Sequence, residues 1–352
     1  MIIKPEVFQD GFVPRRILHR DAEVEQLSRA FQPALMGERP LDVLLTGPSG
    51  VGKTVLARHT INRLRDQTAV DRTYIRCLGL TARDILRTAL RKHPDGPSVF
   101  HENDTIQDLR HELRDTVDAP YILVLDEADG LPDTSALDHL DRVPEISTVI
   151  ICHDAEDWQS RLTNSTNSYR SDDVVRLNRY AVDELADILE IRVREGLSGT
   201  VPRRRLEHIA DTVAGVARDG IQTLKAAIQR AQEQGRSELT EGDVEAGYER
   251  ARGRIRKENL FSLPFHHHLL YAIIHAAGEI RAGELHGRYD ETAEKYYHGR
   301  DLVPISRRSR RSKLKKLKRY DLISWDGESR HRHYWVQDET IAPPIKIELT
   351  SP

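Results

Sequence analysis

The sequence has few cysteines, few aromatic residues and no long apolar run. Its two cysteines, Cys77 and Cys152, cannot form a disulfide framework or a four-thiolate zinc site. No apolar run approaches the roughly 18 residues needed to span a bilayer, and residues 1–12 lack the charged-then-apolar order of a signal peptide. These absences exclude the disulfide-rich and membrane classes, and we expect a cytoplasmic protein with buried thiols.

The chain also lacks a large net charge. Its formal charge of −3 excludes a uniformly basic, histone-like protein but does not exclude local basic patches. Hydrophobic residues at 38% and charged residues at 31% fit a globular protein with a highly charged surface. With aromatic residues at 6% and only two methionines, we expect cores of Leu, Ile, Val and Ala. The length of 352 residues favours two or three domains.

The N-terminal half alternates short apolar runs with helical patterns. The runs at 121–126 and 147–152 are continuously apolar, which is typical of central parallel strands covered on both faces. This alternation predicts an α/β fold with a parallel sheet. The other expected strands are 41–45, 72–78 and 173–177, and the expected helices are 51–64, 81–92 and 105–117.

The C-terminal half predicts two further domains. Four helical patterns joined by short turns fill residues 182–252, and residues 255–259 resemble a linker. Helical patterns followed by two strand-like runs at 322–325 and 333–337 predict a winged helix-turn-helix. We therefore expect a base domain over 1–178, a helical lid over 179–257 and a winged-helix domain over 258–352.

A phosphate-binding loop follows the first strand. The residues GPSGVGKT (47–54) match the full pattern of such loops between a strand and a helix. Glycines allow backbone N–H groups to surround a phosphate, Lys53 would reach the β- and γ-phosphates, and the Thr54 hydroxyl would bind Mg²⁺. The residues expected to hold ATP or ADP here are Gly47, Pro48, Ser49, Gly50, Val51, Gly52, Lys53, Thr54 and Val55.

An acidic pair ends the third predicted strand. The run LVLDE places Asp126 and Glu127 at the carboxyl end of the strand, beside the phosphate loop in a parallel sheet. Asp126 is then the second expected Mg²⁺ residue, and Glu127 is the candidate to polarise the attacking water.

With these motifs, the chain over about residues 12–340 resembles the archaeal origin-recognition and cell-division-control replication initiators. These are AAA+ ATPases with a C-terminal winged helix. The resemblance also covers the segment FVPRRILHRDAEVEQL (12–27) and GVAR (215–218) of the third lid helix. It implies that Pro14, His19 and Arg20 lie beside the adenine, and that Arg218 acts as the lid's sensor residue.

Some positions depart from the family pattern. His153 stands at the end of the fourth strand, where the family carries an Asn that helps to hold the attacking water. Val216 replaces the usual Asp of the lid motif. The segment that carries the family's arginine finger here contains Arg170, which is the first candidate, and Arg161 is the second.

One segment concentrates positive charge. Residues 307–319, RRSRRSKLKKLKR, hold nine Lys or Arg and no acid, so the rest of the chain carries −12. Leu314 and Leu317 are expected to pack inward while the basic residues face out. A polyanion would relieve the repulsion among these charges and release counterions, which indicates duplex DNA as the partner. The expected DNA-binding residues are Ser306, Arg307, Arg308, Arg310, Arg311, Lys313 and Lys315, with Arg330 and Arg332 in the wing.

Three functions remain open at this stage. The leading one is a slow, ATP-switched DNA-binding initiator, nucleoid-associated, which by resemblance marks origins and helps to load the replicative helicase with other initiator copies. The second is a diverged relative that acts as a non-replicative regulator or plasmid initiator. The third is a remodelling ATPase. The run His266–His268 does not suggest a metal site, because adjacent helical positions point in different directions.

Overall fold

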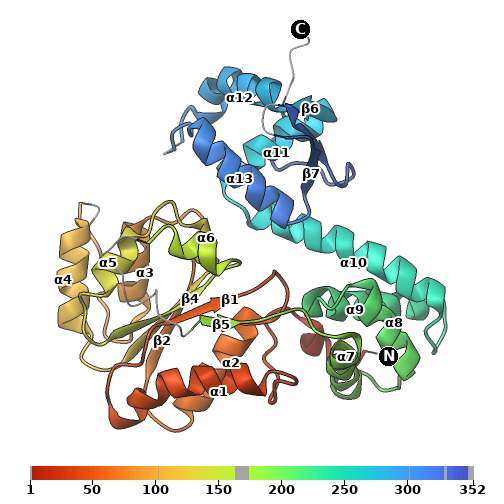
Figure 1. Ribbon diagram of the computed structural model, residues 1–352, viewed down its shortest axis with the longest axis horizontal. Coiled ribbons are helices and arrows are strands. Elements are labelled where there is room, and N and C mark those ends of the chain that lie inside the picture. The colour runs from red at the N-terminus through yellow and green to blue at the C-terminus, as the bar shows by residue number, and fades with distance from the viewer. Residues whose placement is uncertain (1, 102, 163–173, 301, 329–330, 348–352) are drawn as a thin grey trace. The chain divides into compact units, whose positions relative to one another are not determined.

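The computed structural model describes residues 2–101, 103–162, 174–300, 302–328 and 331–347. The chain divides into two compact units, Met1–Tyr248 and Glu249–Pro352 (Figure 1). The expected border between base and lid falls inside the first unit, so the division into three domains stays a prediction.

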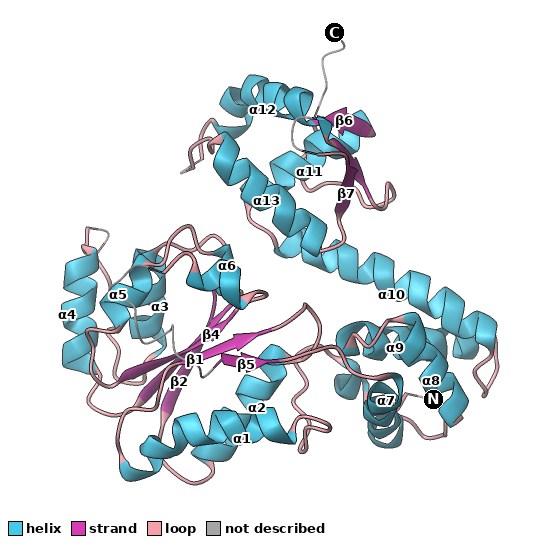
Figure 2. Ribbon diagram, viewed as in Figure 1, coloured by secondary structure: helices cyan, strands magenta, loops and turns pink. Residues whose placement is uncertain are grey.

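A parallel five-stranded sheet forms the centre of the first unit (Figure 2), which confirms the predicted α/β base. The strand order is β2-β3-β4-β1-β5, so the strand before the phosphate loop, β1, lies beside β4, and β4 lies beside β3. The strands are β1 (Val43–Thr46), β2 (Asp71–Arg76), β3 (Tyr121–Asp126), β4 (Ile146–Ile151) and β5 (Val174–Arg176).

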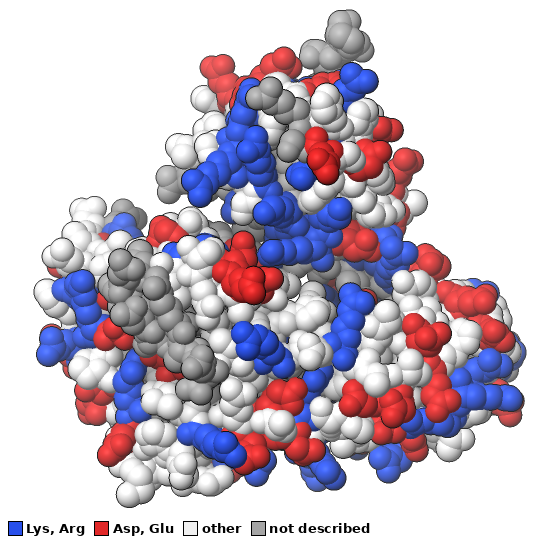
Figure 3. Space-filling model, in the orientation of Figure 1, with Lys and Arg blue, Asp and Glu red and all other residues white. Residues whose placement is uncertain are grey.

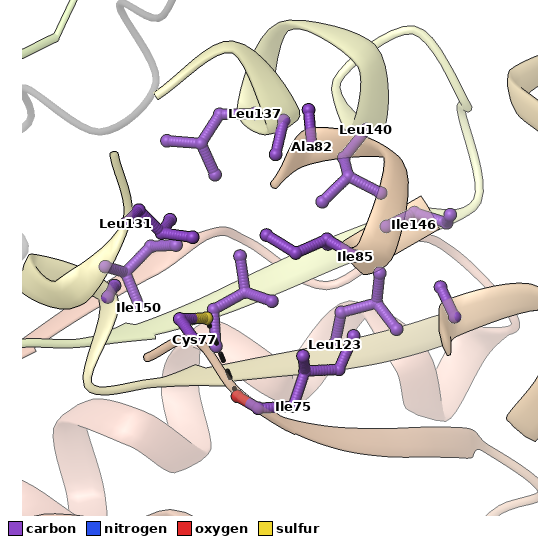
Figure 4. Packing of buried hydrophobic residues seen from close by; sticks show 14 of the residues in the cluster. Ile75, Cys77, Ala82, Ile85, Leu123, Leu131, Leu137, Leu140, Ile146 and Ile150 are labelled. Carbon is purple, nitrogen blue, oxygen red and sulfur yellow. Dashed lines mark hydrogen bonds between the residues drawn. The ribbon is translucent and has the colours of Figure 1, made fainter. Parts of the chain in front are cut away.

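Helices cover both faces of this sheet, since alternate strand residues point to opposite sides. In β3, Leu123 packs with Ile85 on one face, while Ile122 packs with Leu56 on the other. Figure 4 shows part of the buried cluster that contains Leu123 and Ile85, in which the Cys77 thiol donates to the carbonyl of Ile75.

The helices divide between the two faces. The face with Leu123 carries α3 (Ala82–Lys92), α4 (Ile106–Thr116), α5 (Ser135–Leu140) and α6 (Ala155–Gln159). The other carries α1 (Asp21–Phe31) and α2 (Lys53–Arg65). The 3-10 turns η2 (Gln32–Met36) and η3 (Ala128–Gly130) follow α1 and β3.

The first unit also contains the lid helices and an N-terminal arm. The arm includes the 3-10 helix η1 (Pro5–Phe8), whose Phe8 is fully buried among lid residues. The helices are α7 (Val182–Gly196), α8 (Arg203–Thr212), α9 (Ala217–Glu233) and the part of α10 (Glu241–Ser262) up to Tyr248.

The predicted linker at 255–259 is wrong, because these residues lie inside α10, which continues into the second unit. Residues 254–260 contain neither Gly nor Pro, and Arg256 and Leu260, one turn apart, are both buried. Packing of Arg256 and Leu260 therefore stabilises the helix here, and the polar composition of the segment gave no indication of that packing.

The second unit is the predicted winged helix-turn-helix. Three helices pack beside an antiparallel sheet of order β6-β8-β7, and the first strand, β6, was not predicted from the sequence. The elements are α11 (Phe265–Ala277), β6 (Glu279–Arg281), α12 (Ala282–Tyr297), α13 (Arg307–Arg319), β7 (Ile323–Asp326) and β8 (His333–Val336). In the part of the chain that the structure describes, no helix has both the length and the apolar character to cross a membrane.

Candidate functional site

The carboxyl ends of three neighbouring strands bring the predicted nucleotide residues together. β1 leads into the phosphate loop, β3 ends at Asp126, and β4 is followed by Cys152 and His153. Because the strands are parallel neighbours, these segments meet at one edge of the sheet.

The phosphate loop depends on glycines at three turns. Gly47, Gly50 and Gly52 have φ angles of 142°, 77° and 97°, a region that other residues rarely adopt. A Cβ on Gly47 would lie 2.2 Å from the carbonyl oxygen of Leu177. Pro48 and Ser49 are exposed at the tip of the loop, whereas Val51 is buried and Val55 is partly buried in the first turn of α2.

Lys53 begins α2, whose N-terminus contributes partial positive charge at the loop. Its ammonium group donates to the carbonyl oxygens of Gly47 and Pro48, at 2.7 Å each. The lysine is thus held over the loop that would receive the phosphates, and the backbone cradle and cation fit a nucleoside phosphate.

Oxygen atoms suited to Mg²⁺ lie beside this lysine. The Thr54 hydroxyl donates to Oδ2 of Asp126 at 2.7 Å, and the Glu127 N–H donates to the other carboxylate oxygen at 2.9 Å. Burial raises the pKa of Asp126, and the Thr54 hydrogen bond partly opposes that shift. A hydroxyl and a carboxylate in contact are ligand types that Mg²⁺ prefers, so this pair fits the predicted metal site.

The side chain of Glu127 has a cationic partner that the sequence did not identify. Glu127 adopts a left-handed conformation, with φ of 55°. Its Oε1 accepts from Nη2 and Nε of Arg76, at 2.8 and 3.0 Å. Arg76 ends β2 and pairs in register with Asp126, so the adjacency of strands β2 and β3 places it there.

His153 contacts a carboxylate of η3, the short turn after β3. Its Nδ1 lies 3.1 Å from both carboxylate oxygens of Asp129, whose side chain is almost fully buried. Arg161 donates to the backbone carbonyls of Asp129 and Leu131 and lies against the ring of Trp158. Arg161, the second arginine-finger candidate, is therefore engaged within its own chain. Arg170, the first candidate, lies outside the described residues.

The N-terminal segment joins the base to the lid. His59 Nδ1 lies 3.1 Å from the Pro14 carbonyl oxygen, and Nε2 of His19 lies 2.9 Å from Asp187 of α7. The buried Arg20 stacks on the Tyr180 ring at 4.2 Å and donates to the backbone of Asn178. The three residues predicted beside the adenine thus lie along this junction of base and lid. The sequence motif gave no sign of the contact between His19 and Asp187.

Arg218 lies at the start of α9, against the phosphate loop. Its backbone N–H donates to the carbonyl of Gly50 at 3.0 Å, and its guanidinium Nε donates to Asp10 at 2.6 Å. Asp10 belongs to the N-terminal arm, about 200 residues away in sequence, so no local pattern could have identified it.

The basic helix α13 has an exposed cationic face, but not all of its charges point outward. Lys and Arg side chains gather over α13 on the face shown in Figure 3. Ser306 caps the helix by accepting from the Ser309 N–H at 3.3 Å, and Lys313 is partly buried. The exposed basic residues are Arg307, Arg308, Arg311, Lys315, Lys318 and Arg319.

The expectation that all basic residues of α13 face out is wrong for Arg310 and Lys316, which are 5% and 6% exposed. Arg310 donates to the backbone carbonyls of Ile305 and His286, at 3.0 and 3.1 Å, and to the carboxylate of Asp290. Its guanidinium also lies 4.0 Å from the Tyr289 ring centroid. Arg310 therefore fastens α13 to α12, a role that a count of charges cannot distinguish from DNA binding.

The wing supplies additional cations near α13. Arg332 and Lys318 both lie over the Trp325 ring, at 5.2 and 3.9 Å from its centroid. Arg330, the other predicted wing residue, lies outside the described residues. The histidines at 266–268 serve packing, since His268 contacts the Leu260 carbonyl and burial lowers the pKa of His267.

Comparisons with known proteins agree with this arrangement. A family model described as the AAA ATPase domain matches residues 16–151. The sequence is 32% identical to ORC1-type DNA replication protein 9 of Halobacterium salinarum over 351 residues, which cover 98% of this chain and 96% of that protein. It is 35% identical to ORC1-type DNA replication protein 1 of the same organism over 295 residues, covering 82% of this chain and 95% of that protein.

Solved structures show the same fold. The Aeropyrum pernix ORC1 protein, solved in complex with DNA, superimposes with a TM-score of 0.74 at 24% identity, covering 97% of this chain and 95% of that one. CDC6P from Pyrobaculum aerophilum gives a TM-score of 0.63 at 22% identity, covering 97% and 96%. Because the similarity to protein 9 covers 98% of this chain at 32% identity, the chain belongs to the family of ORC1-type DNA replication proteins.

Proposed function

We propose that this protein is an ATP-dependent DNA-binding replication initiator that recognises origins and helps to load the replicative helicase. The observation that carries the proposal is the exposed basic face of α13, on a winged helix in the same chain as a complete phosphate loop. The halobacterial relatives support the link to replication by their names.

The nucleotide would bind through residues of the base and the lid. The loop residues Gly47–Thr54 and the Lys53 ammonium would hold the phosphates, and Thr54 and Asp126 would hold Mg²⁺. Bound Mg²⁺ supplies positive charge that stabilises the negative charge developing on the transferred phosphoryl group. Pro14, His19 and Arg20, at the junction of base and lid, would contact the adenine side.

Hydrolysis would serve as a slow switch rather than as fast turnover. Glu127 would accept a proton from the attacking water, but its carboxylate is bound to Arg76. His153, in place of the family's Asn, is bound to Asp129 and would orient the water only with a different set of partners. Arg218 would act from the lid, and Arg170 is proposed to reach the nucleotide of a neighbouring initiator copy.

DNA would bind the winged helix of the second unit. The helix N-terminus, capped by Ser306, and the exposed cations of α13 suit backbone phosphates. The cations near Trp325 would extend this contact from α13 to the wing. The Aeropyrum pernix ORC1 protein, which was solved in complex with DNA, supports this proposal.

A footprint of the purified protein on its own chromosome tests the proposal. With ATP present, we expect protection of a few preferred sites that coincide with replication start points. Lys53→Ala is the control, since it removes the cation of the phosphate loop and should abolish ATP binding. DNA binding without preferred sites would contradict the proposal, as would a wild-type footprint that is the same with and without ATP.

The second candidate is a regulator of the same family that binds DNA without starting chromosomal replication, or that serves a plasmid. The unusual His153–Asp129 contact favours it, because an altered hydrolysis step would alter the switch. Mapping replication starts after deletion of the gene distinguishes the two: loss of a chromosomal start supports the initiator, and unchanged starts support the regulator.

A further inference from the structure

The N-terminal arm is built into the core of the lid. Val7 and Phe8 are 2% and 0% exposed, and the N–H groups of Ile3 and Lys4 donate to the carbonyl of Gly196 at 2.8 and 3.2 Å. A Cβ on Gly196 would lie only 2.5 Å from the Phe8 ring. The position of the arm relative to the lid helices is therefore closely fixed.

This arm carries one carboxylate to the start of α9. Oδ2 of Asp10 accepts from Arg218 Nε at 2.6 Å, and Oδ1 accepts from Gln222 Nε2 at 2.8 Å. Gln222 also donates to the Phe8 carbonyl at 3.0 Å. Since Arg218 and Gln222 are one turn apart, both oxygens of Asp10 are held by the same face of α9.

The same turn of α9 lies against the phosphate loop. The Arg218 N–H donates to the Gly50 carbonyl, and a Cβ on Gly50 would lie 2.7 Å from Val216 and 3.2 Å from Arg218 Cβ. The backbone of Arg218 is thus pinned beside the site where Lys53 would hold the terminal phosphates. Its guanidinium Nε is bound by the Asp10 carboxylate, which the arm brings to this turn of α9.

We propose that Asp10 competes with the terminal phosphate of ATP for Arg218 and thereby lowers the preference of the protein for ATP over ADP. ADP lacks the γ-phosphate, so only ATP gains from drawing Arg218 away from Asp10. A ligand shifts an equilibrium only by its differential affinity for the two states, and here that difference is the Arg218–phosphate contact minus the Arg218–Asp10 contact. This inference rests on the nucleotide site proposed above.

The test measures affinities for a non-hydrolysable ATP analogue and for ADP, by calorimetry on the full chain. Asp10→Asn keeps the shape and removes the charge, so we expect the dissociation constant of the ATP analogue to fall by about twofold to fivefold, the range for a partly exposed ion pair, with ADP affinity unchanged. The control is Glu6→Gln, which removes a charge from an exposed site on the same arm and should change neither affinity.

The Arg218→Ala variant tests whether the effect depends on the Arg218–Asp10 ion pair. In Arg218→Ala, the further change Asp10→Asn should have no effect on the ratio of the two affinities. An equal change for ATP and ADP, weaker ATP binding, or the same gain without Arg218 would each overturn the competition. If the wild type bound neither nucleotide, or if Lys53→Ala kept full affinity, the proposed nucleotide site itself would fail instead.

Discussion

At the scale of single residues, the nucleotide site is formed by side chains whose partners come from different strands. Thr54 and Asp126, 72 positions apart, share a hydrogen bond because β1 and β3 are separated by one strand only. The motif spacing predicted these two residues because a nucleotide and its Mg²⁺ require oxygen-bearing side chains at these positions. The same reasoning gave no sign of Arg76 or Asp10, whose roles depend on contacts that only the folded chain creates.

The Arg76–Glu127 contact gives a prediction about turnover. The positive charge of Arg76 stabilises the Glu127 carboxylate and so opposes its uptake of a proton from water. Arg76→Ala should therefore raise the ATPase rate about twofold to fivefold without changing ATP affinity. Steady-state phosphate release measures this effect. The gain should vanish in Glu127→Gln. If Arg76→Ala slowed hydrolysis instead, Arg76 would be a residue that orients Glu127 for the reaction.

At the scale of elements, α13 combines two kinds of basic residue that the sequence does not separate. Periodicity placed Leu314 and Leu317 in the core, and both are buried. Periodicity also places Arg310 on the inner side, four residues before Leu314 and seven before Leu317, but its charge made it look like a surface residue. A buried arginine needs an acceptor, and Asp290 on α12 is distant in sequence.

The outward face of α13 leads to a prediction about salt. Replacing Arg311 and Lys315 by Ala removes two exposed cations, so DNA affinity should fall and the slope of log K against log salt should become less negative by about 2. Fluorescence anisotropy with duplex DNA over a salt series measures both. Arg194→Ala with Arg204→Ala removes two exposed cations from the lid and is the matched control. Equal losses in the two variants would show a non-specific charge effect.

Arg310 should behave differently from its neighbours. Arg310→Ala leaves the Asp290 carboxylate and two backbone carbonyls without this donor, so the free energy of unfolding of the second unit should fall by about 2–4 kcal/mol. Chemical denaturation followed by tryptophan fluorescence measures this loss in a Trp158→Phe background, in which Trp325 and Trp335 of the second unit are the remaining tryptophans. Arg311→Ala, one residue along on the exposed side, should leave stability nearly unchanged. A loss of DNA affinity without a loss of stability would assign Arg310 to DNA instead.

At the scale of the whole molecule, the order of motifs predicted a parallel sheet, four lid helices and a winged helix, because each rests on hydrophobic periodicity. The prediction was wrong where polar residues continue a helix, as in α10. There, Arg256 and Arg252 both bind the Asp321 carboxylate of the turn after α13. These ion pairs, rather than a stripe of apolar residues, hold this part of the helix in place. The three residues of β6 were too few to show an alternation of their own.

The second unit should lose stability in acid. In the second unit, burial is the main cause that lowers the pKa values of His267 and His286, with nearby Lys and Arg charges adding to the effect. Folding keeps both neutral, while the unfolded chain protonates them below their ordinary pKa of 6.5. The unfolded state then binds more protons, so the stability of this unit should fall as the pH drops below 6.5.

Thermal unfolding over a pH series, followed by tryptophan fluorescence in the Trp158→Phe background, measures this dependence. His267→Gln should flatten the loss on the acidic side, whereas His298→Gln, at an exposed position after α12, should leave it as in the wild type. An unchanged slope in His267→Gln would mean that other groups control the acid response.

The N-terminal arm has a consequence for synthesis. Phe8 is made before the residues that bury it, since Gly196 and those of α9 follow about 190 to 220 positions later. At roughly 5–20 residues per second, the arm waits on the order of ten seconds or more before the lid can close around it. During that interval Phe8 and Val7 are apolar side chains without their core. A bulky fusion or a binding protein that captures them would therefore act on the folding of the lid, far along the chain from where it attaches.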